Sequence, residues 1–338
     1  MSLLVKKYRA VVIGGGRIGI QDEFLSRATK PRTHSGAFLK HPRILFAGIA
    51  ETDSEQRKWI KRHFPDIAIF KTGEELLRKT RPDIVSIATP DKNHFVSVKQ
   101  AVRFGARLII CEKPISISIQ EAKNIITLAK KNHALLLVNH MRRFDPILQR
   151  VKQDIQNKKF GRIQAVRALY VNGLFNNGTH VIDLLRWYLG EVMWVEGWEN
   201  KKAFASHPGD RNIDGVLQFS NGVRAMLQAL DRDEYYIFEH EFYGTKGAVM
   251  LYDLSFSVGY IFKSRQPHTT AFHEFDRIHM KQIGRQNRSF FEAMADHAVA
   301  CLDGRVHPLS SGEDALKTLK VLTAFEKSAE TPGRKIWL

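Results

Sequence analysis

Short apolar runs alternate with helical patterns along the first 140 residues. Buried-strand patterns lie at residues 11–13, 44–50, 82–90, 107–114 and 134–140, and residues 74–80, 96–106 and 118–133 between them carry helical patterns. A strand that is buried on both faces reads as a continuous apolar run, and helices between such strands indicate parallel crossovers. The alternation predicts a doubly wound parallel α/β domain.

Beyond residue 140 the pattern changes to one helix followed by a series of strands. A helix is predicted over residues 145–158, strand-like runs follow at 163–171, 192–200, 213–231, 236–253 and 256–263, and two late helices lie around 290–302 and 311–329. Within the runs, SNG and GTKG are hairpin-type turns. We therefore expect two domains, residues 1–140 and residues 141–338, the second mainly antiparallel.

A glycine cluster follows the first predicted strand directly. Gly14, Gly16 and Gly19 have G-x-G-x-x-G spacing, with Arg17 and Ile18 between the last two. In a dinucleotide-binding turn the first glycine permits the tight turn, the second lets the backbone approach a pyrophosphate, and the third lets the next helix pack closely. These five residues are candidate cofactor contacts; the alternative is an ordinary strand-to-helix turn.

Glu51 follows the second predicted strand, where an adenosine ribose would lie. A carboxylate there accepts a hydrogen bond from the 2′-hydroxyl and repels a 2′-phosphate, which favours NAD over NADP. Arg17 and Arg57 could offer charge to a phosphate, so NADP stays open. Glu51 lies further from the glycines than usual, and residues 21–33 are the expected insertion, either a surface loop or a flap at the mouth of the site.

Composition narrows the class of protein. The chain has 338 residues, 43% of them hydrophobic, and we expect a protein without a targeting or membrane segment. Cys111 and Cys301 stand far apart in apolar company, which favours a reduced, cytoplasmic protein without a metal cluster. The net charge of +17 indicates an anionic partner. Scattered basic residues and no nucleic-acid-binding motif favour an anionic cofactor and substrate over nucleic acid.

Three of the predicted strands carry candidate residues at their carboxyl ends: Thr89 and Pro90, Glu112 and Lys113, and Asn139 and His140. Ligands bind at the carboxyl ends of the strands in such sheets. An ammonium beside a nicotinamide can stabilise the alkoxide-like charge that develops as hydride leaves a carbinol carbon. Lys113 is the candidate for this role, although a surface charge is the simpler reading of a lysine after a strand.

Five motifs together resemble one known family. VVIGGGRIG, SIATPDKNH, CEKP, NHMRRFDP and NNGTHVIDLLRWYLG, in that order, are similar to the glucose-fructose oxidoreductase / inositol dehydrogenase / MocA (Gfo/Idh/MocA) family. The resemblance implies an N-terminal Rossmann domain and a C-terminal open-faced β-sheet that forms dimers or tetramers. It also implies reversible oxidation of a sugar or cyclitol hydroxyl by NAD or NADP.

The resemblance also implies roles for particular residues. His180 matches the family's histidine and would be the general base, with Lys113 orienting the substrate hydroxyl. Thr89 and Pro90 would lie beside the riboses of the cofactor. His94 would lie near the nicotinamide, and Glu112 would bind the nicotinamide ribose. Arg142 would pair with a substrate carboxylate or phosphate, or else form an interdomain salt bridge. The Lys113–Pro114 peptide is a candidate for the cis form.

One position departs from the family pattern. Many members carry Asp four residues before the histidine, where this chain has Asn176. Asp183 is an alternative orienting group, one helical turn after His180, and both residues are candidate substrate contacts. Asn176 resembles the branch that oxidises UDP-N-acetylhexosaminuronic acids. A non-catalytic redox sensor or assembly protein that keeps the cofactor site, and a cyclitol dehydrogenase, remain the alternatives.

Overall fold

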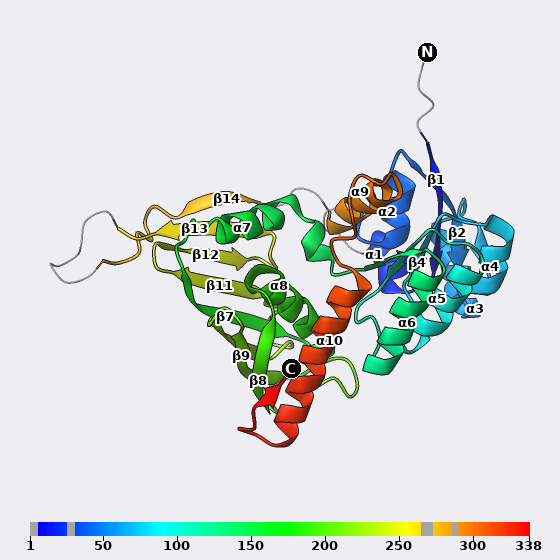
Figure 1. Ribbon diagram of the computed structural model, residues 1–338. Coiled ribbons are helices and arrows are strands. Elements are labelled where there is room, and N and C mark those ends of the chain that lie inside the picture. Colours follow the sequence, from blue (N-terminus) through cyan, green and yellow to red (C-terminus); the bar gives the residue numbers. More distant parts are fainter. Residues whose placement is uncertain (1–5, 26–30, 265–272, 286–288) are drawn as a thin grey trace, which may run out of the picture. The chain divides into compact units, whose positions relative to one another are not determined.

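The computed structural model describes residues 6–25, 31–264, 273–285 and 289–338, and the chain forms two units (Figure 1). The first contains residues 1–144 and 287–317, and the second contains residues 145–286 and 318–338. The expected boundary after residue 140 differs from this division, because residues 287–317 return to the first unit. They do so since the helix Phe290–Leu302 buries Phe291 and Met294 in the same core as Phe38.

The first unit is built on a six-stranded parallel sheet with the order β3-β2-β1-β4-β5-β6. Its strands are β1 (Tyr8–Ile13), β2 (Ile44–Ala50), β3 (Ile69–Phe70), β4 (Ile84–Ile87), β5 (Leu108–Cys111) and β6 (Leu135–Val138). The chain runs outward in one direction from β1 to β3 and in the other from β4 to β6. The prediction of a doubly wound α/β domain is therefore confirmed, and the β1/β4 neighbourhood is its topological switch point.

Helices cover this sheet, and most begin at a side-chain cap. They are α1 (Asp22–Leu25), α2 (His34–Lys40), α3 (Ser54–His63), α4 (Gly73–Thr80), α5 (His94–Arg103), α6 (Ile119–Lys131) and α9 (Phe290–Leu302), with single turns η1 (Arg17–Gln21), η2 (Asp91–Asn93) and η3 (Met141–Phe144). Thr33, Asp53 and Ser118 each accept a hydrogen bond from an N–H in the first turn of the helix that follows. These caps set where the helices start, and so which residues remain in the loops at the strand ends.

The second unit is built on a nine-stranded sheet with the order β14-β13-β12-β11-β7-β10-β9-β8-β15. Its strands are β7 (Ile163–Val171), β8 (Val192–Glu199), β9 (Ile213–Phe219), β10 (Arg224–Leu230), β11 (Glu239–Gly244), β12 (Gly247–Tyr252), β13 (Ser257–Phe262), β14 (Lys281–Arg285) and β15 (Ile336–Trp337). Neighbouring strands are antiparallel except β7 and β10, which are parallel. The expectation of a mainly antiparallel second sheet is confirmed.

Helices of the second unit cover one face of its sheet. They are α7 (Pro146–Gln156), the turn η4 (Leu174–Gly178), α8 (Thr179–Leu189) and α10 (Gly312–Glu330), which begins in the first unit. Phe325 of α10 lies against Gly197 and Gly215, where a Cβ would come within 2.8 Å and 2.5 Å of its ring. Both glycines are therefore required for the helix to approach the sheet this closely.

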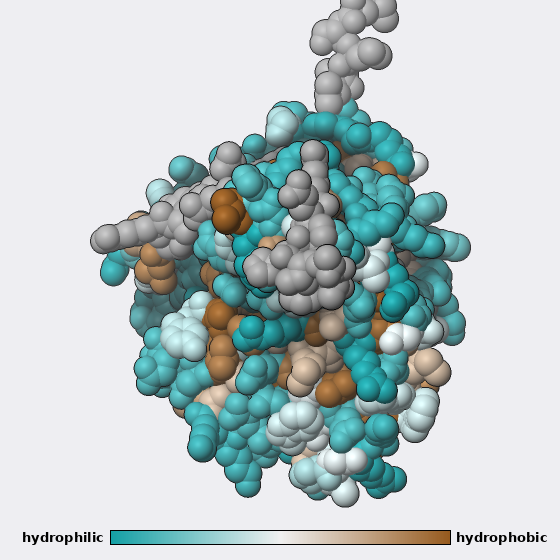
Figure 2. Space-filling view, turned by 90° about the vertical axis from the view of Figure 1, so that its left-hand side faces the viewer, coloured by the Kyte–Doolittle hydropathy of each residue, from teal (hydrophilic) through white to brown (hydrophobic). Residues whose placement is uncertain are grey.

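The opposite face of this sheet carries mixed side chains. On β10, Ala225, Leu227 and Ala229 are buried, whereas Arg224, Met226 and Gln228, which alternate with them, are exposed. Figure 2 shows one face of the molecule, on which apolar side chains gather in small patches among hydrophilic ones. No helix in the described part of the chain is long and apolar enough to cross a membrane.

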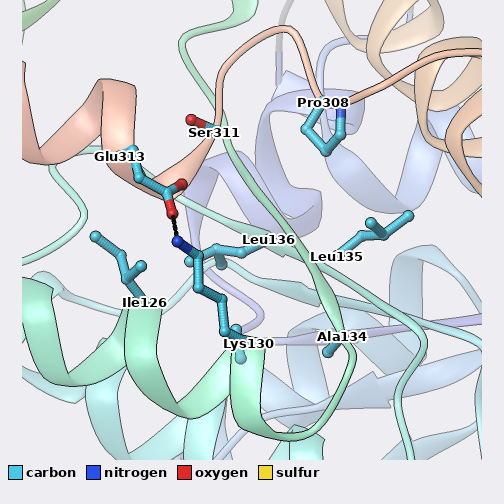
Figure 3. A pocket seen from close by; sticks show the side chains of 9 residues that line it. Ile126, Lys130, Ala134, Leu135, Leu136, Pro308, Ser311 and Glu313 are labelled. Atoms are coloured by element: carbon cyan, nitrogen blue, oxygen red, sulfur yellow. Dashed lines mark ion pairs between the residues drawn. The ribbon is translucent and has the colours of Figure 1, made fainter.

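A small apolar pocket of about 200 Å³ lies at the edge of the first sheet, beside β6. It is lined by residues of α6, β6 and the segment that leads into α10, among them Ile126, Leu136 and Pro308, and the ion pair between Lys130 and Glu313 lies at its side (Figure 3). Because Leu135 and Leu136 belong to the start of β6, this pocket is at the opposite end of the strand from the polar residues that follow it.

Candidate functional site

The glycine turn after β1 has the geometry of a phosphate cradle. Gly14 has φ +106°, and a Cβ there would lie 2.5 Å from the carbonyl oxygen of Ala88, so only glycine fits. At Gly19 a Cβ would lie 2.0 Å from the carbonyl oxygen of Gly14, whereas Gly16 has no atom within 4 Å of that position. The open side of the turn is thus at Gly16, and the residues present fit a bound pyrophosphate.

Two helical elements follow this turn in the described residues. One π-helical turn, η1, contains Arg17 and Ile18, and α1 ends at Leu25. The expected insertion falls here: part of it, residues 26–30, lies outside the described residues, and its far end is held by Glu23. The Glu23 carboxylate accepts hydrogen bonds from the Arg32 N–H at 2.8 Å and the Thr33 hydroxyl at 3.1 Å.

Glu51 lies at the carboxyl end of β2 beside the glycine turn. Its Oε2 accepts a hydrogen bond from the Gly15 N–H at 2.7 Å, and its Oε1 accepts one from the Asp53 N–H at 2.9 Å. The two arginines that could favour NADP have other partners: Arg57 donates to the carbonyl groups of Glu51 and Thr52, and Arg17 pairs with Asp22. This arrangement suits a ribose hydroxyl at Glu51 better than a 2′-phosphate.

The turn after β4 lies against the glycine turn. A Cβ on Gly14 would come within 2.9 Å of the Thr89 N, and the Thr89 hydroxyl is buried without a hydrogen-bond partner among the described residues. Pro90 follows it and precedes η2. The buried His94 ring lies between the carbonyl oxygens of Thr89, at 3.1 Å, and Ile115, at 3.2 Å. A buried hydroxyl beside the cradle is a group that a bound ligand would satisfy.

Glu112 follows β5 and lies in a buried polar cluster that the sequence did not predict. Its Oε1 is 2.9 Å from His34 Nε2 and accepts a hydrogen bond from Asn139 Nδ2 at 2.6 Å. On the other side of the ring, His34 Nδ1 is 2.8 Å from the Ser86 hydroxyl. Burial raises the pKa of the Glu112 carboxyl, but the hydrogen bond from His34 and its electrostatic attraction, the hydrogen bond from Asn139 and the charge of Lys113 together outweigh burial and hold that pKa below its ordinary value.

Lys113 follows directly, with its N–H 3.2 Å from Glu112 Oε2. The Lys113–Pro114 peptide is cis, as expected. Lys113, Glu112, Thr89, Glu51 and the glycine turn all follow the carboxyl ends of parallel strands. The first unit therefore gathers the sequence-predicted cofactor residues and the candidate catalytic lysine at one edge of its sheet.

Arg142 lies on η3, which comes just after β6 and the polar residues Asn139 and His140. Its guanidinium carbon is 5.8 Å from the centre of the Phe290 ring, and the side chain is largely buried. His140, just before this turn, lies 3.1 Å from the Ser310 hydroxyl. Both contacts tie the end of β6 to the segment that surrounds α9.

In the second unit, His180 lies in the first turn of α8, and its ring packs edge-on to Phe238 with centres 6.5 Å apart. Asp183, one turn later, is buried and accepts a hydrogen bond from the Thr318 hydroxyl at 3.3 Å. Arg186 also donates to that hydroxyl, at 2.9 Å. The start of α8 is thereby attached to α10 through Thr318.

Asn176 lies in η4, the turn that leads into α8. Asp210, from the loop between β8 and β9, accepts hydrogen bonds from the N–H groups of Phe175 and Asn176 at 2.9 and 2.8 Å. Asn177 donates to the Tyr236 hydroxyl at 2.7 Å. Asp210 was missed by sequence reasoning, because nothing in its local sequence indicates that it caps a turn 34 residues earlier.

A glycine-rich turn at the switch point of a doubly wound sheet, with an acidic residue after β2, defines a dinucleotide-binding Rossmann domain. The family model described as an oxidoreductase family with an NAD-binding Rossmann fold matches residues 8–140, and the GFO/IDH/MocA C-terminal domain matches residues 168–250. The chain therefore belongs to the Gfo/Idh/MocA family. It is an oxidoreductase with an NAD-binding Rossmann fold.

Three similar proteins illustrate the family. D-glucoside 3-dehydrogenase of Escherichia coli (strain K12) is 20% identical over 365 residues, which cover 96% of each chain. The aldose-aldose oxidoreductase of Caulobacter crescentus has a TM-score of 0.78 at 20% identity, covering 98% of this chain and all of that one. The WlbA dehydrogenase of Bordetella pertussis, solved with NADH and UDP-GlcNAcA, has a TM-score of 0.76 at 20% identity, covering 98% and 99%. At such identities the structural likeness shows the fold.

Proposed function

We propose that this protein is an NAD-dependent dehydrogenase that oxidises a secondary hydroxyl of a sugar, sugar acid or nucleotide sugar, reversibly. The observation that carries the proposal is the position of Lys113 at the same sheet edge as the glycine turn and Glu51, in a chain of this oxidoreductase family. A nicotinamide bound by this turn would supply the acceptor for the hydride of the carbinol carbon. The remaining task of the protein is to hold the hydroxyl and take its proton.

Lys113 and His180 divide that task. The Lys113 ammonium donates a hydrogen bond to the substrate oxygen and stabilises the negative charge that develops there. The His180 imidazole takes the hydroxyl proton, a step that needs a base with a pKa near working pH. Asn176 and Asp183, on either side of His180 in the chain, are proposed to contact substrate or to orient that ring, and Arg142 to pair with an anionic group of the substrate.

The cofactor contacts are proposed to be the glycine turn with Arg17 and Ile18, Glu51, Thr89, Pro90, His94 and Glu112. Support for the turn comes from the open space at Gly16 and from the buried Thr89 hydroxyl beside it. Support for NAD in preference to NADP comes from the Glu51 carboxylate, which would repel a 2′-phosphate.

Within this class we propose a UDP-sugar acid as the substrate. Asn176 stands where many members of the family have Asp, and WlbA, which shares this fold, was solved with UDP-GlcNAcA. The net charge of +17 suits an anionic nucleotide sugar. We also propose a cytoplasmic location, in keeping with two buried free cysteines, and small molecules as the ligands of the site.

The test is reduction of NAD and of NADP in the presence of UDP-sugar acids, UDP-sugars, free sugars and inositols, followed by the absorbance of the reduced nicotinamide. For the substrate that reacts, we expect Lys113→Ala and His180→Asn each to lower kcat/KM by about a hundredfold or more. NADH binding, followed by its fluorescence, should persist in both variants. A wild-type protein that binds NADH but oxidises none of these compounds would instead support the non-catalytic sensor.

A further inference from the structure

We propose that His34 is a positioning residue for Lys113, acting through the buried carboxylate of Glu112. The inference rests on the proposed function, because it matters to catalysis only if Lys113 contacts the substrate. It concerns a histidine on α2, which is 79 positions away in the sequence and which no motif connects with the lysine.

The first step is the contact between His34 and Glu112. The His34 ring is fully buried, packs edge-on to Phe291 and has a polar partner at each nitrogen, Glu112 at Nε2 and Ser86 at Nδ1. An ionised carboxylate can only accept hydrogen bonds, so Nε2 carries the hydrogen that it shares with Glu112. The Ser86 hydroxyl lies 2.8 Å from Nδ1, so the ring is held at both nitrogens with Nε2 directed at Glu112.

The second step is the contact between Glu112 and Lys113. Oε1 receives hydrogen bonds from His34 and Asn139, and Oε2 receives the backbone N–H of Lys113. These donors come from α2, from the end of β6 and from the lysine itself. The carboxylate is therefore held from three directions, and one of them is the backbone that carries the proposed catalytic ammonium.

The third step is the consequence of losing His34. A buried carboxylate that loses a donor must find another or bear a desolvation penalty. Rotation of Glu112 toward another donor would release the Lys113 N–H and move the ammonium. Displacement of a reacting group by about 1 Å can cost about a hundredfold in rate.

The variants are chosen to separate the hydrogen bonds from the volume of the ring. His34→Phe fills the space but donates to nothing, whereas His34→Gln keeps an N–H donor at the position of Nε2. His297→Gln is the control, because it changes another largely buried histidine of the first unit that contacts Leu309 and Cys301 and none of the proposed site residues. We expect His34→Phe to lower kcat by about a hundredfold, with little change in NADH affinity, and His34→Gln to recover most of the loss.

A second readout does not need turnover. Competitive acetylation of the protein without cofactor, read by mass spectrometry, gives the reactivity of Lys113 relative to exposed Lys99. We expect a several-fold change in that ratio in His34→Phe, and none in His34→Gln or His297→Gln. Should His34→Phe fail to fold, Glu112→Gln keeps the shape of the carboxylate while removing its charge, and should change the ratio likewise.

The two hypotheses can fail separately. Unchanged Lys113 reactivity in a folded His34→Phe or Glu112→Gln protein overturns the positioning role, whatever the enzyme oxidises. Changed reactivity in a protein that oxidises no sugar leaves the positioning contact standing and removes the catalytic role of Lys113. A kcat that falls equally in His34→Phe and His34→Gln also contradicts the inference, because the donor would then be irrelevant.

Discussion

At the scale of single residues, Gly16 and Gly19 are glycines of one motif that are required for different reasons. Gly19 is required by packing, because a Cβ there would meet the Gly14 carbonyl oxygen at 2.0 Å. Gly16 has open space around the position of a Cβ and an ordinary negative φ. Packing therefore does not explain why position 16 is a glycine, whereas the close approach of a ligand to the backbone there does explain it.

This difference predicts opposite outcomes for two alanine substitutions. The free energy of unfolding of Gly16→Ala should lie within about 0.5 kcal/mol of the wild-type value. The same variant should bind NADH about tenfold more weakly, a loss of about 1.4 kcal/mol in binding free energy. Gly19→Ala should lose about 2 kcal/mol or more of stability through overpacking. Urea unfolding and NADH fluorescence measure the two quantities. Wild-type NADH affinity in Gly16→Ala would show that the turn does not hold the pyrophosphate.

At the scale of elements, α9 is attached to the first unit by contacts that depend on a neutral histidine. His297 Nε2 accepts a hydrogen bond from the Leu309 N–H at 3.0 Å, and its ring stacks on Phe144 with centres 5.1 Å apart. Burial lowers the pKa of His297 from 6.5 to about 4. Protonation of Nε2 would remove the acceptor, so acid should loosen the segment between α9 and α10.

The sign of the pH effect follows from the two pKa values. Above pH 6.5 the histidine is neutral in the folded and unfolded chains, and it contributes no pH dependence. Between pH 6.5 and about 4 the unfolded chain binds the proton first, so stability falls with falling pH, by about 2 to 3 kcal/mol in total. Urea unfolding at pH 7.5, 5.5 and 4.5 should show that the free energy of unfolding decreases as the pH falls. In His297→Gln this decrease should be smaller, because the contribution of His297 is absent. An unchanged pH profile in His297→Gln would assign the acid sensitivity to other groups.

Most elements of both sheets were predictable from their patterns, and the errors have local causes. The strand pattern 82–90 is longer than β4, which ends at Ile87, because Thr89 and Pro90 already form the turn beside Gly14. The insertion, by contrast, was expected over residues 21–33: among the described residues α1 ends at Leu25, within that range, and α2 begins at His34, directly after it. Periodicity does not record the end of β4, because that end depends on what Thr89 contacts.

At the scale of the whole molecule, the exposed face of the second sheet predicts association between copies of the chain. Met226 on β10 is 57% exposed and Trp337 on β15 is 66% exposed. Apolar side chains left on a sheet face away from its helices are typical of protein interfaces. We propose a homodimer or homotetramer formed through this face.

Analytical ultracentrifugation over a range of concentrations tests the association. We expect the wild type to sediment as a dimer or tetramer and Met226→Glu to dissociate at higher concentrations than the wild type, because a carboxylate would have to be buried in the interface. Val96→Glu is the matched control, since Val96 is similarly exposed but lies on α5 of the first unit. A wild type that is monomeric at every concentration would contradict the proposed interface. So would a Val96→Glu protein that dissociates at the same concentrations as Met226→Glu.

The sequence by itself determined the doubly wound sheet, the glycine turn, the acidic residue after β2 and the lysine after β5. Those features depend on local periodicity, on the conformations open to glycine and on the rule that parallel strands end at one edge. Only the tertiary structure decided that α9 joins the first unit, that β7 pairs in parallel with β10, that Asp210 caps the turn before α8, and that His34, Ser86 and Asn139 surround Glu112. The physical reason is that each of these depends on side chains far apart in the chain, whose meeting is set by the packing of whole elements and leaves no periodic trace in the sequence.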